Sequence, residues 1–334
     1  MPSIKEIARA ANVSPSTVSL VLNNKGNISE QTRQRVLEVV REMGYTRSVH
    51  ARNLRENQSR VFGFAWSPLR SAYNPVLDLF LYEMVRLSEQ HGRHLLLFTE
   101  DEQEDTENIY RSLIDSRRVD GFILANTDRD DPRFAFLLEA NVPFVAFGRS
   151  LSAYDEDAYW VDVDGAAGTF AAVSHLVEHG HQHIAMLAWP QGSASGDERV
   201  KGYLDALAYH ALSVRDDYIV RVLNDVTGGY QGAQQLMQLP APPTAVVAVS
   251  DIIALGALRY FAEHGHRIAV TGFDNTPASE FSHPPLTTLK QPIYEIADLC
   301  VGMLLAQITG QEVERRHHLL PPHLIIRASS TLDY

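Results

Sequence analysis

The spacing of apolar residues along the chain changes near residue 61. Before that point, apolar residues recur at helical spacing in short stretches separated by polar turns. Beyond it, short and nearly continuous apolar runs alternate with longer amphipathic stretches. This alternation predicts parallel β-sheets that are covered by helices on both faces. We therefore expect a small helical head followed by a larger α/β body.

Serines mark the start of each helix predicted in the head. Ser3, Ser14 and Ser29 each precede a helical stretch and can accept a hydrogen bond from its first turn. Pro15 occupies the first position of the second helix, where its missing N–H costs nothing. Gly44 ends the third helix. The head is thus predicted to contain three short helices.

The body is predicted to fold as two doubly wound α/β lobes, divided near the segment "WVDVDG". Strands are expected at 61–66, 94–98, 121–125, 144–147, 160–163, 183–187, 245–249, 268–273 and 324–327. Helices are expected near 75–91, 105–116, 132–140, 166–179, 198–210, 228–239, 252–264 and 293–309. We expect one lobe to comprise 61–160 with about 291–318, and the other 161–290 with about 319–334. Ligands of such folds bind at the carboxyl ends of the strands.

Composition excludes several classes of protein. The only cysteine is Cys300, so a disulfide framework and a cysteine-rich zinc site are both excluded. No apolar run reaches the roughly 18 residues of a membrane span. The first residues, "MPSIKEIARAANVS", carry charges where a signal peptide has its apolar core. We therefore expect a cytoplasmic protein without a membrane partner.

Charge is distributed unevenly along the chain. The net charge is −12, yet residues 1–60 contain ten Lys and Arg residues against five acidic residues. The head and linker therefore carry +5, which leaves −17 for residues 61–334. A basic head on an acidic body indicates that the head alone binds a polyanion.

The second predicted helix has the features of a DNA-recognition helix. Val18, Val21 and Leu22 would pack on the first helix, which turns the opposite face outward. Two short helices joined by a tight turn form a helix-turn-helix, whose second helix enters the major groove. The DNA-binding residues expected in the head are Ser3, Ser14, Pro15, Ser16, Thr17, Ser19, Leu20 and Asn23. The alternative is a helical cap on the body that does not contact DNA.

Longer stretches resemble the LacI/GalR family of bacterial transcription regulators. The segments "IKEIARAANVSPSTVSLVLNNKGNISEQTRQRVLEVVREMGY" and "HARNLR" look like the family's head and hinge helix. In the body, "HLVEHGHQHIAML", "SDIIALGAL", "GFDN" and "PPLTTLKQP" are also similar and occur in the right order. The resemblance implies a lambda-repressor-like helix-turn-helix domain (1–46), a hinge helix and linker (47–60), and an effector-binding and dimerisation domain (61–334). The body is then expected to resemble type I periplasmic sugar-binding proteins.

The resemblance also implies a function. It indicates a homodimeric transcriptional repressor of pseudo-palindromic operator DNA, controlled by a small ligand between the two lobes. Leu54 would take the family's intercalating role, and Arg52 and Arg55 would neutralise phosphates. The chain departs from the family at Leu20, where Arg is common, so we expect an altered operator sequence. At His50 the family usually has an apolar hinge contact, so His50 either faces solvent or makes that contact sensitive to pH.

Polar and aromatic residues follow many of the predicted strands, as a sugar site requires. The candidate effector-binding residues are Ser67, Tyr73, Asn126, Arg149, Trp189, Arg199, Ser250, Asp251, Asp274 and Gln291. By resemblance, Arg199, Asp274 and the Ser250–Asp251 pair match effector contacts of the family, and Gln291 matches a position near the cleft. Alternatively, Asp251 and Asp274 cap local structure, and Trp189 is a core ring.

Other readings of the body are weaker. The segment "EHGHQH" at 178–183 suggests a metal, but it resembles an ordinary turn of the family, so neither metal nor cofactor is expected. An enzyme would need a G-x-G-x-x-G, Walker or G-x-S-x-G motif, none of which occurs where it is required. The effector is expected to be a sugar or glycoside, with a nucleobase or sugar phosphate as alternatives. Without a leucine-heptad tail after residue 330, we expect a dimer rather than a tetramer.

Overall fold

The computed structural model describes residues 2–22, 24–45, 58–66, 75–100 and 106–331. The chain divides into two compact units, a head of Met1–Ser59 and a body of Arg60–Tyr334. Within the part of the chain that the structure describes, no helix is both long and apolar enough to cross a membrane.

The head contains the three predicted helices, α1 (Ile4–Ala10), α2 (Pro15–Leu22) and α3 (Glu30–Glu42). The predicted caps are confirmed. Ser3 forms a capping box with Glu6, because its side chain accepts from the Glu6 N–H while Glu6 accepts from the Ser3 backbone. Ser14 Oγ accepts from the Thr17 N–H at 3.1 Å, and the Ser29 side chain accepts from Thr32.

The core of the head brings α1 and α2 together as predicted. Its buried residues are Ile7, Ala8, Ala11, Val18, Val21 and Val36, with Leu22 partly buried beside them. The face of α2 opposite this core is turned to solvent, and Leu20 on that face is 38% exposed. At the start and on the outer face of α2, Ser14, Pro15, Ser16 and Leu20 are exposed.

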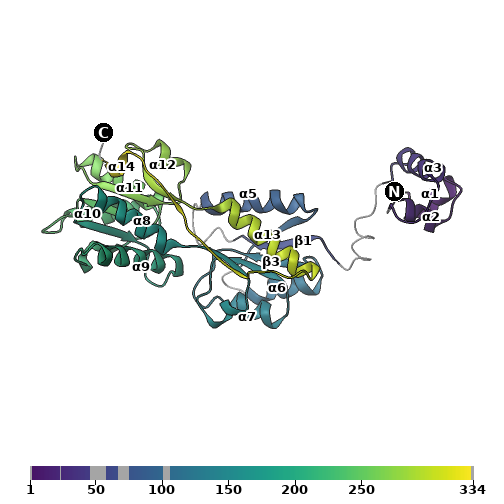
Figure 1. Cartoon of the computed structure of the whole chain (residues 1–334), viewed down its shortest axis with the longest axis horizontal. Coiled ribbons are helices and arrows are strands. Elements are labelled where there is room, and N and C mark those ends of the chain that lie inside the picture. Colours follow the sequence, from purple (N-terminus) through teal and green to yellow (C-terminus); the bar gives the residue numbers. More distant parts are fainter. Residues whose placement is uncertain (1, 23, 46–57, 67–74, 101–105, 332–334) are drawn as a thin grey trace. The chain divides into compact units, whose positions relative to one another are not determined.

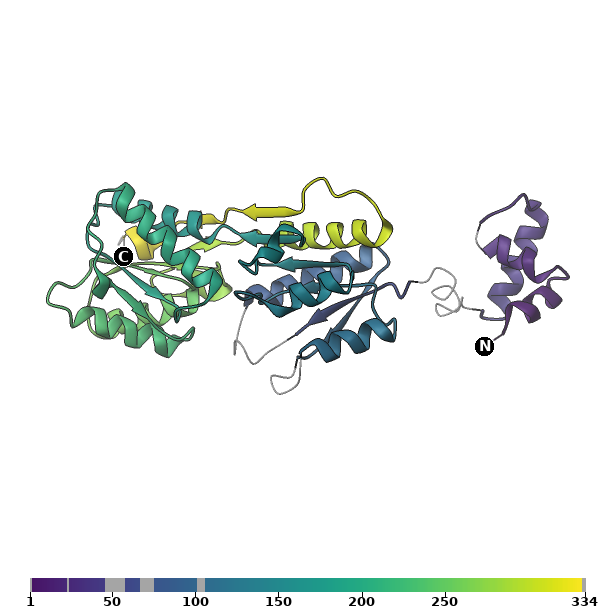
Figure 2. The same ribbon diagram turned by 90° about the horizontal axis from the view of Figure 1, so that it is seen from below.

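The body consists of two lobes, each built on a six-stranded sheet (Figures 1 and 2). The N-lobe sheet has the order β11-β5-β4-β3-β1-β2, and its neighbouring strands are all parallel. Its strands are β1 (Val61–Ala65), β2 (His94–Phe98), β3 (Gly121–Leu124), β4 (Phe144–Phe147), β5 (Trp160–Val163) and β11 (His317–Leu320). Its helices are α5 (Pro75–Gln90), α6 (Thr106–Asp115), α7 (Pro132–Glu139) and α13 (Ile293–Thr309), with the 3-10 turn η2 (Ala153–Glu156).

Helices cover both faces of the N-lobe sheet, as strand–helix alternation predicts. Helices α5 and α13 pack side by side on one face, where Phe62, Phe64 and Ile123 point (Figure 1). Helices α6 and α7 pack on the other face, against Phe122 and Phe144. The carboxyl ends of β3, β4 and β5 are left uncovered by these helices, and they lead into loops.

The C-lobe sheet has the order β12-β10-β9-β8-β6-β7. Its strands are β6 (Ile184–Ala188), β7 (Ile219–Arg221), β8 (Ala245–Ala248), β9 (Ala269–Phe273), β10 (Thr287–Lys290) and β12 (His323–Ile325). Its helices are α8 (Gly165–Glu178), α9 (Ala194–Tyr209), α10 (Val226–Met237), α11 (Asp251–Glu263), α12 (Pro277–Phe281) and α14 (Ala328–Thr331), with the 3-10 turn η3 (Asp216–Tyr218). Helix α8 packs on α9 and α10 packs on α11, around one continuous core.

The chain passes between the lobes three times, after Val163, at Gln291–Pro292 and at Pro321–Pro322. The first crossing follows β5, so Val161–Val163 belong to the N-lobe and not to the C-lobe as the predicted boundary had it. Figure 2 shows the last crossing as the yellow segment that runs from the N-lobe into the C-lobe. Because β12 enters the C-lobe where β10 leaves it, these two strands are antiparallel in an otherwise parallel sheet.

The predicted strands and helices are largely confirmed, but three strands were missed. They are β7 ("IVR"), β10 ("TTLK") and β11 ("HHLL"), which have three or four residues each and no apolar run longer than two. All three are held by backbone pairing with a neighbouring strand rather than by an apolar run of their own. Helix α9 also begins at Ala194, a full turn before the predicted start.

Candidate functional site

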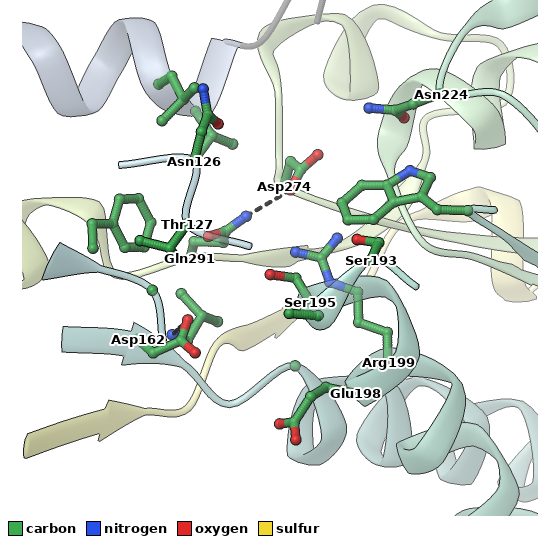
Figure 3. Close-up of a pocket in the computed structure, with 18 of the residues that line it drawn as sticks. Asn126, Thr127, Asp162, Ser193, Ser195, Glu198, Arg199, Asn224, Asp274 and Gln291 are labelled. Carbon is green, nitrogen blue, oxygen red and sulfur yellow. Dashed lines mark hydrogen bonds between the residues drawn. The ribbon is translucent and has the colours of Figure 1, made fainter. Parts of the chain in front are cut away.

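A cavity of about 720 Å³ lies between the two lobes of the body. The N-lobe contributes the carboxyl ends of β3, β4 and β5, and the C-lobe contributes the loops after β6, β7 and β9. Figure 3 shows polar side chains from both lobes pointing into this space. Six of the predicted effector-binding residues line it, namely Asn126, Arg149, Trp189, Arg199, Asp274 and Gln291.

Arg199, in the first turns of α9, is held between two aromatic rings. Its guanidinium carbon lies 3.6 Å from the centre of the Phe273 ring and 4.9 Å from that of Trp189. It also donates a hydrogen bond to the Val249 carbonyl. The side chain is 6% exposed, and its buried Nε has no hydrogen-bond partner among the described residues. Burial lowers the pKa of Arg199, although the nearby carboxylates, Asp274 first, oppose this.

Asp274 and Gln291 form a polar pair beside Arg199. Gln291 Nε2 donates to Asp274 Oδ1 at 2.7 Å, and Figure 3 shows this bond as a dashed line. Asp274 directly follows β9 and has a φ of 121°, a conformation that side-chain-bearing residues rarely adopt. Burial raises the pKa of Asp274 to about 7, opposed by Arg199 and reinforced by the charge of Asp251. The pair thus presents a carboxyl group whose ionisation is sensitive to what surrounds it.

Asn126 stands on a loop that Arg133 fixes from behind. Arg133 Nη2 donates to the Ala125 carbonyl at 3.1 Å and to the Asn126 carbonyl at 3.3 Å. The buried guanidinium also forms an ion pair with Asp131 at 2.6 Å. The backbone of Asn126 is thus held in place at a φ of 51° on the cavity wall.

Arg149 lines the cavity, but its hydrogen bonds go to two carboxylates. Nε donates to Asp162 Oδ2 at 2.8 Å, and Nη2 donates to Glu198 Oε2 at 2.7 Å. Asp162 lies on β5 of the N-lobe and Glu198 on α9 of the C-lobe, so this ion pair spans the lobes. Burial lowers the pKa of Arg149, but the two carboxylates outweigh it and the net shift is upward.

Trp189 follows β6 and exposes part of its ring to the cavity. Its buried Nε1–H has no hydrogen-bond partner among the described residues. A buried donor without a partner costs on the order of 1–3 kcal/mol, which a ligand that accepts this bond would recover. With Arg199 Nε, it is the second such donor in the cavity wall.

Ser250 and Asp251 lie behind the cavity wall, although they were predicted to contact the effector. Ser250 caps α11, and its Oγ donates at 2.7 Å to Asn224 Oδ1, which does line the cavity. Asp251 accepts from the Thr276 N–H at 2.7 Å and from its hydroxyl at 3.0 Å. Both residues therefore support cavity residues from behind the wall. The N-cap of α11 is Ser250, so Asp251 does not cap this helix as the alternative interpretation expected, and it anchors Thr276 instead. Ser67 and Tyr73 lie outside the described residues.

Several cavity residues were not predicted from the sequence. They are Thr127, Asp128, Asp162, Ser193, Ser195, Glu198, Asn224 and Thr276. Ser193 and Ser195 were missed because α9 was predicted to begin too late, and Asn224 because β7 was not predicted. Asp162 had a visible signal, since it is the one polar residue within the strand "WVDV".

The predicted DNA-binding residues of the head gather at the start and outer face of α2. Ser14 Oγ lies 2.6 Å from Ser16 Oγ and 2.9 Å from Thr17 Oγ1, which makes a cluster of hydroxyls at the helix N-terminus. Ser14, Pro15, Ser16 and Leu20 are exposed, whereas Thr17 and Ser19 are half-buried. Ser3 is exposed at the start of α1. Asn23, His50, Arg52, Leu54 and Arg55 lie outside the described residues.

The histidines of "EHGHQH" have ordinary structural contacts. The preceding His175 is buried, with Nε2 2.8 Å from Ser330 Oγ, and His179 Nδ1 lies 2.8 Å from the His175 carbonyl oxygen. Among the described residues, no group of three or more His, Cys, Asp or Glu side chains is arranged to hold a metal ion.

Comparisons with known proteins cover nearly the whole chain. Residues 3–48 match the family of bacterial regulatory proteins, lacI family, and residues 173–330 match the periplasmic binding protein-like domain. The transcriptional repressor CytR of Escherichia coli K12 is 33% identical over 337 residues, which covers 98% of this chain and 96% of CytR. The transcriptional regulator CelR of Thermobifida fusca is 32% identical over 337 residues, with 98% of each chain covered.

Solved structures agree with these relatives. The lac repressor dimer bound to operator and the anti-inducer ONPF superposes with a TM-score of 0.84, at 28% identity over 98% of this chain and 99% of that one. A complex of the regulator CelR with cellobiose has a TM-score of 0.74 at 28% identity, over 98% of this chain and 100% of that one. The helix-turn-helix head and the two-lobed body are therefore found together in the relatives.

Proposed function

This chain belongs to the lacI family of bacterial regulatory proteins, and we propose that its regulatory ligand is a sugar or glycoside bound in the cavity between the lobes. The protein is a transcriptional repressor with a DNA-binding head and a ligand-binding body. We propose a binding role rather than a catalytic one for the cavity, since the relatives bear the names of regulators.

The arrangement around Arg199 carries the proposal for the ligand. Arg199 Nε and Trp189 Nε1 are buried donors that lack partners among the described residues, while Asp274 and Gln291 offer acceptors and a donor beside them. Adjacent sugar hydroxyls can each donate and accept, so they match such an alternating set. The apolar face of a sugar ring would lie against the exposed part of the Trp189 ring.

The residues that line the cavity indicate which side chains contact the effector. We propose that Asn126, Trp189, Arg199, Asp274 and Gln291 contact the effector directly. Ser193, Ser195 and Asn224 add hydroxyl and amide groups on the C-lobe side of the same space (Figure 3). Because these groups come from both lobes, a ligand that bridges them would bias the angle between the lobes.

We propose that this bias controls operator affinity. Effector and operator are then coupled reciprocally, with a coupling free energy of typically about 1–3 kcal/mol. In the head, the exposed start of α2 is proposed to face the DNA, with Ser14, Ser16 and Thr17 near phosphates and Leu20 at a base edge. We propose that Leu54 of the hinge, together with Arg52 and Arg55, completes the interface in the minor groove of a homodimer.

Two measurements on the full chain test this function. Thermal unfolding would be followed against a panel of neutral mono- and disaccharides, including cellobiose, together with nucleosides, nucleobases and sugar phosphates. A ligand at a hundred times its Kd stabilises the folded state by about 2.7 kcal/mol, so the class that binds is identified directly. If nucleobases were the one class that stabilises the protein, the sugar proposal would be contradicted. The Trp189 and Phe147 rings of the cavity would then be expected to stack on a base.

The second measurement addresses DNA. Binding to duplexes selected from a random pool should recover a pseudo-palindrome and should weaken steeply with salt, since phosphate contacts release counterions. A protein that shows no preference for any symmetric duplex, with or without ligand, would contradict the proposed repression.

A further inference from the structure

Of the two arginines in the described part of the cavity lining, Arg149 is the one that forms ion pairs with two carboxylates. Asp162 accepts from Nε at 2.8 Å and Glu198 accepts from Nη2 at 2.7 Å. The guanidinium also lies over the Trp160 ring, 5.6 Å from its centre, so its plane is fixed as well. An arginine in a ligand cavity ordinarily attracts a carboxylate or phosphate. Here its Nε and Nη2 donors already bond to carboxylates of the protein.

Asp162 alone would balance the charge of Arg149. It belongs to the same lobe, and its second oxygen accepts from the Val163 N–H at 2.8 Å, which fixes its orientation. Glu198 comes from the other lobe and adds a negative charge that the pair does not require. The charge of Glu198 is therefore a surplus charge on the cavity wall, next in sequence to Arg199.

Carboxylates also outnumber arginines in the rest of the described lining. Arg199 is the second cavity cation, and it lies beside Asp274, while Asp128 adds another carboxylate on the N-lobe side. In their ordinary ionised forms, two arginines thus face four carboxylates in the described lining. An anionic ligand would have to displace Glu198 from Arg149 or accept its repulsion.

We propose that Glu198 is a specificity-determining residue, which occupies Arg149 and so keeps the cavity selective for neutral polyhydroxylated effectors over carboxylated or phosphorylated ones. The inference rests on the proposed function of the cavity as the effector site. Glu198 would thus distinguish sugars and glycosides from sugar phosphates and uronates, which carry the same pattern of hydroxyl groups. Removing the charge of Glu198 while keeping its shape would leave Asp162 as the one charged partner of Arg149 in the described lining and would remove the surplus negative charge that repels an anion.

The first test uses inorganic phosphate as the probe. The full chain is compared in four forms, the wild type and the variants Glu198→Gln, Glu198→Asp and Asp205→Asn. Glu198→Gln keeps an oxygen that can accept from Arg149 but removes the charge, whereas Glu198→Asp keeps the charge. Asp205→Asn is the matched control, since Asp205 lies on the same helix and pairs with Lys201 on the exposed surface. The midpoint temperature of unfolding should rise with phosphate concentration in Glu198→Gln and in none of the other three forms. If the wild type responds equally, or if Glu198→Gln does not respond while remaining folded, the inference is overturned.

The second test compares neutral and anionic partners of matched shape. Glucose and glucuronate, and cellobiose and cellobionate, would be titrated against wild type, Glu198→Gln and Asp205→Asn. The preference for the neutral member should fall roughly tenfold or more in Glu198→Gln, because one unit charge a few ångströms from the ligand is removed. It should not change in Asp205→Asn. A wild type that prefers the anionic member of a pair overturns the inference.

The two tests separate the inference from the proposed function. If no neutral sugar binds the wild type, the proposed effector class fails, yet the phosphate titration still decides whether Glu198 shields Arg149. If neutral sugars bind but the preference is the same in Glu198→Gln, the proposed function stands and the role of Glu198 is rejected. A merely structural role for Glu198 would lower the affinity for both members of a pair equally.

Discussion

The guanidinium carbon of Arg199 lies 3.6 Å from the centre of the Phe273 ring. With Trp189 4.9 Å away, the planar group is stacked against aromatic carbon while one of its N–H edges donates to the Val249 carbonyl. Stacking and a fixed fork of donors are properties that lysine lacks. The position therefore depends on the shape of the arginine and not only on its charge.

Replacement of Arg199 by Lys should weaken effector binding, and with it the response to effector, while leaving operator binding intact. The variant loses charge-assisted hydrogen bonds of about 1.5–3 kcal/mol, which corresponds to roughly 10- to 100-fold weaker effector binding. Calorimetric titration with the ligand found in the panel measures the loss, and operator affinity without ligand is measured beside it. Arg259→Lys is the control, because Arg259 pairs with Glu263 on the exposed face of α11. Equal losses in both variants would contradict a specific role for Arg199.

The raised pKa of Asp274 predicts how stability depends on pH. A carboxyl with a pKa of about 7 when folded and about 4 when unfolded binds more protons in the folded state between these values. The free energy of unfolding of the body should therefore fall as pH rises from about 4 to about 7. Asp274→Asn keeps the oxygen that accepts from Gln291 but removes the titrating carboxyl group. The free energy of unfolding of this variant should therefore decrease less as pH rises.

The comparison of wild type and Asp274→Asn is made by thermal unfolding at several pH values. The free energy of unfolding of the variant should rise relative to that of the wild type as pH rises, by up to about 4 kcal/mol at pH 8, since the shift is about three units at about 1.4 kcal/mol per unit. Part of the fall should remain, because burial also raises the pKa of Asp251. Asp216→Asn, at an exposed position, serves as control. Parallel curves for wild type and Asp274→Asn would show that this carboxyl does not titrate in that window.

The sequence predicted those parts of the fold that depend on local pattern. Serine caps and apolar faces were sufficient to predict the helices of the head. Nearly continuous apolar runs were sufficient to predict the central strands of the body. Strands β7, β10 and β11 were missed because they lie toward the edges or at crossings between lobes, where pairing and not an apolar run stabilises them. The antiparallel β12 depends on the path of the chain between lobes, which no local pattern encodes.

The candidate site was predictable only where a residue directly follows a recognised strand. Asn126, Trp189 and Asp274 meet that condition, and all three line the cavity. The motif around Asp251 was equally clear, yet the side chain turns inward to hold Thr276. Glu198 could not be found in this way, since its role depends on Arg149 of the other lobe, 49 positions away in the sequence.

Exposed apolar residues on α5 predict where the homodimer forms. Leu79 is 49% exposed and Tyr82 is 63% exposed, one turn apart on the helix face that points away from the core. Tyr82→Glu should weaken dimerisation at least roughly tenfold by burying a charge, and operator affinity should fall with it. Sedimentation at several concentrations measures the dimer. Tyr209→Glu, at a 75% exposed position on α9, is the matched control, and a larger effect there would locate the dimer contact elsewhere.

Leu20 predicts a change in operator sequence that can be reversed. The side chain is 38% exposed on α2, beside Gly26, and it can offer a base only apolar contact such as that with a thymine methyl. Leu20→Arg should gain a guanine at one symmetric position of the half-site, with about 1–3 kcal/mol of discrimination for a bidentate contact. Selection from random duplexes by wild type, Leu20→Arg and the apolar control Leu20→Met reads out the preference. If all three recover the same half-site, Leu20 does not face a base, and the proposed docking of α2 in the major groove has to be revised.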